Sequence, residues 1–214
     1  MSAAPDAAKP VRKFHFISGL PRAGSTLLAA ILKQNPRFRA GMTSPLADIM
    51  GVVIAEASSK NDFSFAVSDD QRVSLLRGLV ENFYAGPAGA EVTFDTSRLW
   101  CSRMQLLDML FPQAKVIACV RQLPWVLDSM ERLVRRQPVG VSKVFRFDTN
   151  TTVYSRIEAL TDPRGMVGFS FQAIKDAFYG QYAPDHLLLL TYESLVRDPV
   201  AAVRAVYQFI GEPW

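Results

Sequence analysis

The stretch from Phe14 to Leu32 limits the possible fold more than any other part of the sequence, because it reads as a strand, a tight turn and a helix. Its first residues are apolar and favour extended backbone, as expected of a strand buried in a sheet. Gly19 ends this run, and from Ser25 onward apolar residues recur on one helical face. A strand that passes directly into a helix through a glycine turn predicts an α/β fold.

The turn itself, Gly19 to Thr26 (GLPRAGST), has the G-x-x-x-x-G spacing of a phosphate-binding loop. Backbone N–H groups of such a loop converge on an anion, and the dipole of the following helix adds roughly half a positive charge. The lysine that follows the second glycine in nucleotide triphosphatases is replaced by Ser25, and Arg22 lies inside the loop. An arginine offers a planar fork to one phosphate group. The loop therefore predicts a site for a single phosphate or a phosphosulfate; the alternative is a glycine-rich turn without a ligand.

Three further segments, 91–95, 115–120 and 187–191, read as strands with amphipathic helices between them. The second of these, KVIACV, is almost wholly apolar, which is typical of a strand covered on both faces of a parallel sheet. We therefore expect an α/β protein with a parallel β-sheet flanked by helices. Ligands of such sheets lie beyond the carboxyl ends of the strands. Four segments should meet there: 19–26, 95–98, 121–129 and 192–193.

Local sequence patterns mark several helix ends. Ser68 with Gln71 has the form of a capping box, and Asp198-Pro199 should open the last helix, which Gly211 should close. Another helix is expected after Pro45. Its buried face should consist of Leu46, Ile49, Val53 and Ala57.

The composition excludes several classes of protein. With 49% hydrophobic and 21% charged residues in 214, the chain can form one domain with a large core. A net charge of +4 is too small to imply nucleic acid, and neither the two histidines nor Cys101 and Cys119 suggest a metal site or a disulfide scaffold. The N-terminus lacks the apolar core of a signal peptide, and no 18-residue apolar run follows, so we expect a soluble cytoplasmic protein without a membrane partner. The oligomeric state is left open.

Three motifs in order resemble the sulfotransferases that use 3′-phosphoadenosine 5′-phosphosulfate (PAPS). GLPRAGSTLL is similar to the family's 5′-phosphosulfate loop, FPQAKVIACVRQLPWVLDS to its 3′-phosphate segment, and LLLLTYESLVRDP to its penultimate strand and helix. The resemblance implies a P-loop nucleotide-kinase-like sulfotransferase architecture in a single domain over 14–214, after a disordered or extended tail over 1–13. Relatives usually continue past residue 214 into a basic segment that closes over the 3′-phosphate and the adenine, and the domain expected here lacks it.

The resemblance also implies a set of donor-binding residues. Arg121 and Ser129 would hold the 3′-phosphate of PAPS or of its product adenosine 3′,5′-bisphosphate (PAP), and Tyr192 would lie near the adenine. The alternatives are a structural ion pair for Arg121, an ordinary helix hydroxyl for Ser129 and a core aromatic for Tyr192. The full predicted set is Arg22, Ala23, Gly24, Ser25, Thr26, Arg121, Ser129 and Tyr192.

Two departures from the family affect the chemistry. Some relatives carry an adenine-stacking aromatic where this chain has Leu27, and others carry a catalytic glutamate after the first helix, whereas residues 41–45 contain no carboxylate. Of the carboxylates that strands deliver to the ligand edge, Glu193 is expected to anchor the following helix. Asp95 is therefore the predicted catalytic base, with Arg98 contacting the transferring group; the alternative is that the two simply pair with each other.

The sequence as a whole predicts an enzyme that transfers a sulfuryl group from PAPS to a hydroxyl or amine acceptor, in which Arg22 and the loop amides stabilise the leaving phosphate. The identity of the acceptor, small molecule or protein side chain, is left open. One alternative is a P-loop small-molecule kinase, which the missing lysine disfavours; another is a non-catalytic nucleotide-binding protein. No metal is required.

Overall fold

The structure, a computed structural model, describes residues 12–58, 64–86, 90–136, 152–180 and 183–214. Most of the predicted N-terminal tail, residues 1–11, lies outside the described residues. Among the described residues, no helix combines the length and the apolar character needed to cross a membrane.

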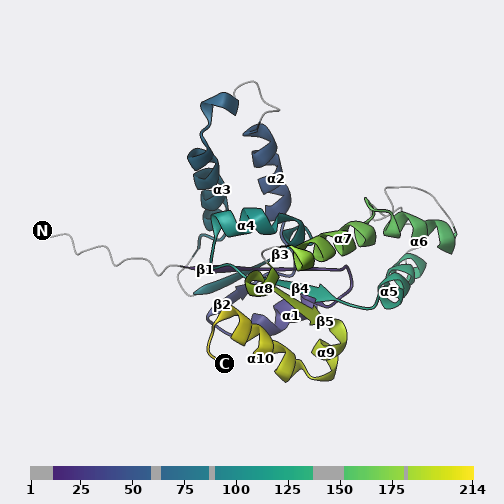
Figure 1. The fold of residues 1–214 in the computed structure, drawn as a ribbon. Helices are drawn as coiled ribbons and strands as arrows, with labels where there is room; N and C mark the ends of the chain where they lie inside the picture. Colours follow the sequence, from purple (N-terminus) through teal and green to yellow (C-terminus); the bar gives the residue numbers. More distant parts are fainter. Residues whose placement is uncertain (1–11, 59–63, 87–89, 137–151, 181–182) are drawn as a thin grey trace, which may run out of the picture.

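A five-stranded sheet forms the centre of the fold (Figure 1). Its order is β2-β3-β1-β4-β5, and every neighbouring pair is parallel. The three inner strands are largely buried, as the apolar run at 115–120 predicted. The strands are β1 Lys13–Gly19, β2 Phe38–Ala40, β3 Val92–Thr96, β4 Val116–Val120 and β5 Leu187–Thr191.

Helices cover both faces of the sheet, so the predicted α/β class is confirmed (Figure 1). The helices α1, α9 and α10 lie on one side, and α2, α3, α4 and α7 on the other. Their bounds are α1 Ser25–Leu32, α2 Leu46–Glu56, α3 Asp69–Phe83, α4 Met104–Leu110, α5 Leu123–Arg136, α6 Val153–Thr161, α7 Met166–Tyr179, α8 Ala183–His186, α9 Tyr192–Arg197 and α10 Pro199–Ile210, with short 3₁₀ helices η1 Ser64–Ala66 and η2 Trp100–Arg103.

The predicted helix caps are confirmed. The backbone N–H of Gln71 donates to Ser68 Oγ (3.2 Å), and that of Ser68 donates to Gln71 Oε1 (2.8 Å), so α3 begins with a full capping box. The side chain of Asp198 caps α10, and Gly211 ends it with a left-handed φ of 71°. These ends are local features, which explains why the sequence alone predicts them.

Two predictions about the helix and strand content were wrong. The edge strand β2 was missed, because three residues are too few to show an alternating pattern. In α2 the buried residues are Leu46, Ala47 and Met50, whereas Ile49 is 38% exposed. The face of α2 that packs on the core therefore differs from the face that the sequence predicted.

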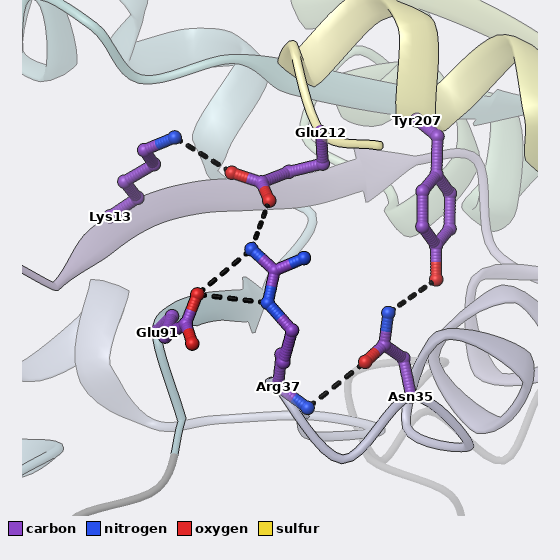
Figure 2. A network of polar contacts seen from close by, with 6 residues as sticks. All are labelled: Lys13, Asn35, Arg37, Glu91, Tyr207 and Glu212. Atoms are coloured by element: carbon purple, nitrogen blue, oxygen red, sulfur yellow. Dashed lines mark hydrogen bonds and ion pairs between the residues drawn. The ribbon is translucent and has the colours of Figure 1, made fainter. Parts of the chain in front are cut away.

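A cluster of polar residues, here called the Glu212 cluster, joins the amino-terminal edge of the sheet to the chain after α10 (Figure 2). Glu212 accepts from Lys13 Nζ and from Arg37 Nη2, both at 2.7 Å, and Arg37 also binds Glu91 at 2.8 Å. Nearby, Asn35 Nδ2 donates to the Tyr207 hydroxyl of α10 (3.0 Å). Although burial disfavours its charge, the bonds from both cations keep the pKa of Glu212 below its ordinary value.

Candidate active site

The loop between β1 and α1 depends on two glycines whose backbone a residue with a side chain rarely adopts. Gly19 has φ 129°, and a Cβ there would lie 2.1 Å from the carbonyl oxygen of Cys119 on β4. Gly24 has φ 94° and caps α1, which begins at Ser25. The predicted strand, turn and helix are confirmed, and the N–H groups of the first turn of α1 face the carboxyl edge of the sheet.

Arg22 also has a left-handed backbone, with φ 60°, which is uncommon for a residue other than glycine. Its exposed side chain leaves the loop, and Nε donates to Ser129 Oγ on α5 at 3.0 Å. The backbone of the loop therefore directs this guanidinium towards the helix that carries the predicted 3′-phosphate hydroxyl.

Arg121 follows β4 immediately and connects the loop with α9. Its Nη1 donates to the carbonyl oxygen of Arg22 (3.2 Å), and its guanidinium carbon lies 4.2 Å from the ring centroid of Tyr192. Its Nε is buried and has no hydrogen-bond partner in the described part of the chain. A buried donor without a partner costs about 1–3 kcal/mol, which a phosphate oxygen would offset. The structure therefore brings Arg22, Arg121, Ser129 and Tyr192 together as one group.

A cavity of about 810 Å³ opens next to this group, at the carboxyl ends of β1 and β3. It is lined by the loop, the residues after β3, the chain around the start of α2, and parts of α5 and α7. Its polar lining includes Arg22, Ser25, Thr43, Ser44, Asp48, Arg98 and Arg164, and its apolar lining Met42, Leu99, Met130, Leu133, Met166 and Phe169. A ligand in the cavity would contact both the loop and a largely apolar wall.

Asp95, the predicted base, is not among the described residues that line this cavity. It is only 1% exposed, and its two carboxylate oxygens accept hydrogen bonds from the Tyr84 hydroxyl (2.5 Å) and from Trp100 Nε1 (2.7 Å). Burial, with the neighbouring Asp95, raises the pKa of Tyr84 well above its ordinary value. This geometry fits a structural role, but the partners of Asp95 are Tyr84 and Trp100 and not Arg98, which the structural alternative had named.

The alternation of β3 explains the placement of Asp95. Asp95 is in register with Phe16, whose ring packs against Trp100 at 4.7 Å, so both side chains point into the layer that η2 covers. The sequence analysis considered the position of Asp95 near the end of its strand, but not the face of the sheet to which its side chain points.

Arg98, in contrast, lines the cavity, where the sequence placed it. Its carbonyl oxygen accepts from Ser18 Oγ (3.1 Å), which fixes the backbone beside the loop. Desolvation lowers the pKa of Arg98, and the negative charge of Asp48 acts in the opposite direction. The charge of Asp48 thus favours the protonated guanidinium of Arg98, and both residues line the cavity.

Asp48 is the carboxylate that the sequence analysis missed. It lies in the first turn of α2 and lines the cavity with an exposed side chain, and no hydrogen bond or ion pair with described residues occupies it. Hydrogen bonds anchor the preceding segment to β3: Ser44 N–H donates to the Thr96 carbonyl (3.1 Å), and Thr96 Oγ1 donates to the Gly41 carbonyl (2.7 Å). The family's glutamate was expected within residues 41–45, which end before the first turn of this helix.

The apolar wall supplied by α7 was also missed. Met166 and Phe169 line the cavity, and Arg164 lies at the turn before the helix. The sequence analysis expected helices in this part of the chain but found no motif there, because a wall that contacts a ligand through apolar side chains looks like any other helix face. Residues 137–151 lie outside the described residues.

An all-parallel sheet whose central strand leads through a glycine loop into a helix places the chain among the α/β proteins with a P-loop-like fold. Comparison with protein families is more specific, since the model of the sulfotransferase family matches residues 15–214. The chain therefore belongs to the sulfotransferase family. The family and the fold together support an enzyme of sulfuryl transfer in general.

Solved structures with the same fold include three sulfotransferases. The sulfotransferase domain from the curacin biosynthetic pathway is 20% identical, with a TM-score of 0.59 over 97% of this chain and 76% of that chain. The sulfotransferase from Alicyclobacillus acidocaldarius is 17% identical (TM-score 0.58; 97% and 83% covered). Mouse sulfotransferase SULT7A1, solved in complex with PAP, is 16% identical (TM-score 0.55; 96% and 60% covered). At these identities the likeness shows the fold. A sequence search of curated proteins gave no match.

Proposed function

We propose that this protein transfers the sulfuryl group of PAPS to a hydroxyl or amine acceptor. The observation that carries the proposal is the pairing of two anion-binding features: a lysine-free phosphate loop with Arg22, and Arg121 beside it with a buried, unpartnered Nε. A donor with a phosphosulfate at one end and a separate phosphate at the other fits both. That mouse SULT7A1 was solved with PAP supports the same choice of nucleotide.

In this proposal different residues bind the two ends of the donor. The amides of Ala23 to Thr26, with Arg22, would hold the 5′-phosphosulfate, and Arg121 and Ser129 would hold the 3′-phosphate. The hydrogen bond that now joins Arg22 to Ser129 satisfies two groups which would each turn to a phosphate oxygen. Bound PAPS supplies an activated sulfuryl group on its phosphosulfate.

The acceptor would enter the 810 Å³ cavity along its apolar wall. We assign the role of general base to Asp48, in place of the buried Asp95, because Asp48 is the carboxylate among the described residues that line this cavity. As the acceptor oxygen or nitrogen forms its bond to sulfur, Asp48 takes its proton, and the bond from sulfur to the phosphate oxygen breaks. Arg22 and the loop amides stabilise the charge that develops on the leaving phosphate, and Arg98 lies beside the transferring group.

Nucleotide choice tests the proposal. Calorimetry should show that PAP binds more tightly than ATP and that Mg²⁺ does not change its affinity. Turnover is then measured as PAP released from PAPS in the presence of a panel of alcohols, phenols and amines. Tighter binding of ATP that requires Mg²⁺ would support the small-molecule kinase instead. Binding of PAP without turnover of any acceptor in the panel would favour the non-catalytic nucleotide-binding protein.

A further inference from the structure

A second hollow, of about 400 Å³, lies next to the loop and apart from the larger cavity. It is lined by Arg121, Trp125, Tyr192, Glu193, Val196 and Arg197. Arg121 connects it with the phosphate loop, because its Nη1 donates to the carbonyl oxygen of Arg22. The hollow thus has cationic groups at a site that already adjoins an anion-binding loop, and it also has aromatic side chains.

Trp125 is the large apolar side chain that this hollow leaves uncovered. It lies in the first turn of α5 and is 52% exposed, although its neighbour Val126 and Met130 one turn further on are fully or almost fully buried. These two residues fix the helix against the core, so Trp125 is held on the outer side. Exposing part of an indole to water is unfavourable, because apolar surface gains free energy when it leaves water. A flat ligand in the hollow would recover this free energy.

Tyr192, the aromatic residue that the sequence placed near the adenine, is less accessible to such a ligand. The guanidinium of Arg121 lies over its ring at 4.2 Å. Gly24 lies close to the same ring, since a Cβ on Gly24 would be 3.0 Å from Tyr192 Cδ2. Tyr192 is thus already in contact with the arginine and the loop, and Trp125 has the more exposed aromatic side chain in the hollow.

We propose that Trp125 is the surface on which the base of the nucleotide donor stacks, and that it makes the site prefer a nucleotide to a simple anion. This inference rests on the proposed function, because it takes the ligand to be a nucleotide. The same hollow offers the guanidinium of Arg121 to a phosphate and the indole of Trp125 to a planar ring. A nucleotide, which joins a phosphate and a base through a sugar, matches this pair. Stacking on an aromatic side chain contributes to binding with any base, since every base has a π-face.

The experiment compares PAP with inorganic pyrophosphate, which has the charge but no base, on Trp125→Ala and Trp125→Phe. All variants carry Trp214→Phe as well, because Trp214 is 62% exposed and packs on Tyr207, so its fluorescence would obscure that of Trp125. The remaining tryptophan, Trp100, is buried against Asp95. Binding is measured by calorimetry and by fluorescence quenching, and the fold of each variant by circular dichroism.

PAP should quench the fluorescence of Trp125, and pyrophosphate should not. Trp125→Ala should weaken PAP about 5- to 150-fold and change pyrophosphate less than about twofold, and Trp125→Phe should restore most of the loss. If Trp125→Ala binds PAP within about twofold of the parent, or loses PAP and pyrophosphate equally, Trp125 is not the stacking surface, and the proposed function still stands. If the parent protein itself binds no PAP, the proposed function fails and this inference fails with it.

Discussion

At the scale of single residues, Arg121 has structural contacts and a proposed role in binding the 3′-phosphate, and two nucleotides tested on one variant can distinguish them. It packs on Tyr192 and contacts the loop, and its Nε has no hydrogen-bond partner in the described part of the chain. Arg121→Ala should weaken PAP by on the order of 1.5–3 kcal/mol, the contribution of a hydrogen bond to a charged group, and hardly change AMP, which lacks the 3′-phosphate. Calorimetry with both nucleotides measures this. Equal losses for PAP and AMP would show that Arg121 supports the fold rather than the 3′-phosphate.

Asp48 and Asp95 form a matched pair for testing the general base. Asp48→Asn should fold and bind PAP as the parent does and lose at least ~100-fold in turnover, because the amide cannot take up the acceptor's proton. Stopped assays of PAP release, with calorimetry of PAP binding as the control, measure both quantities. Turnover within a few-fold of the parent would mean that another group takes the proton.

Asp95→Asn should instead lower the free energy of unfolding by about 1–3 kcal/mol. The Tyr84 hydroxyl and Trp100 Nε1 both donate to Asp95, and an amide has one oxygen to accept them, so its NH₂ group would face a donor. Urea denaturation measures the loss. A stable Asp95→Asn protein without turnover would return the catalytic role to Asp95.

The residue scale also shows where sequence reading succeeds. The position of the loop and of the segment from Arg121 to Ser129 at one edge could be predicted because the carboxyl ends of parallel strands meet there, whereas the ligand roles of Arg121 and Ser129 are what the family resemblance implied. Asp48 could not, because what brings it there is a tertiary contact, the pairing of Ser44 with Thr96, which leaves no pattern in the sequence. The exposure of Trp125 could not be predicted either, because it depends on which face of α5 packs on the core.

At the scale of elements, Gly19 and Gly211 separate two costs of replacing a glycine. Both have a left-handed φ, but a Cβ at Gly19 would lie 2.1 Å from the Cys119 carbonyl oxygen, whereas a Cβ at Gly211 would meet nothing within 4 Å among the described residues. Gly211→Ala should cost about 1–2 kcal/mol from backbone strain alone. Gly19→Ala should cost more than this and displace β1 from β4, because backbone cannot move aside as a flexible side chain can.

Urea denaturation of the two variants, with PAP binding for whichever folds, distinguishes the costs. A Gly19→Ala protein as stable as Gly211→Ala would mean that the contact between β1 and β4 adjusts easily.

The elements themselves were predictable to different degrees. The inner strands and the ends of α3 and α10 follow from runs of apolar residues and from caps, which depend on neighbours within a few residues. The strand β2 and the buried face of α2 depend on partners far away in the sequence, and both were predicted incorrectly. Where a segment is short or its two faces are similarly apolar, only the tertiary contact decides.

At the scale of the whole molecule, one buried histidine should link stability to pH. His15 on β1 is 3% exposed, and burial lowers its pKa from 6.5 to about 4; the positive charges of Lys13 and Lys115 act in the same direction and Glu212 opposes them. Its Nδ1 accepts from the backbone N–H of Lys115 (3.1 Å), so Nε2 carries the hydrogen in the neutral ring. The folded protein therefore keeps this ring neutral at a pH where the unfolded chain protonates it.

The sign of the effect follows from this difference. Stability from this group is complete above pH 6.5 and is lost as the pH falls towards 4, by on the order of 3 kcal/mol in total. Urea denaturation at a series of pH values between 7.5 and 4 should show the loss, and His15→Asn, which keeps an acceptor near Lys115, should flatten the curve above pH 5. Parallel curves for the parent and the variant would show that His15 does not control the effect.

The Glu212 cluster and the candidate active site lie at opposite ends of the strands. Lys13 begins β1, and Arg37 and Glu91 directly precede β2 and β3, whereas the loop and the cavity lie where β1 and β3 end. A strand of this length separates the two edges by roughly 20 Å. Substitutions at the cavity wall therefore leave the charges that tie α10 to the sheet untouched. The residues that line the cavity at one edge of the sheet can therefore change while the Glu212 cluster at the other edge keeps the chain folded.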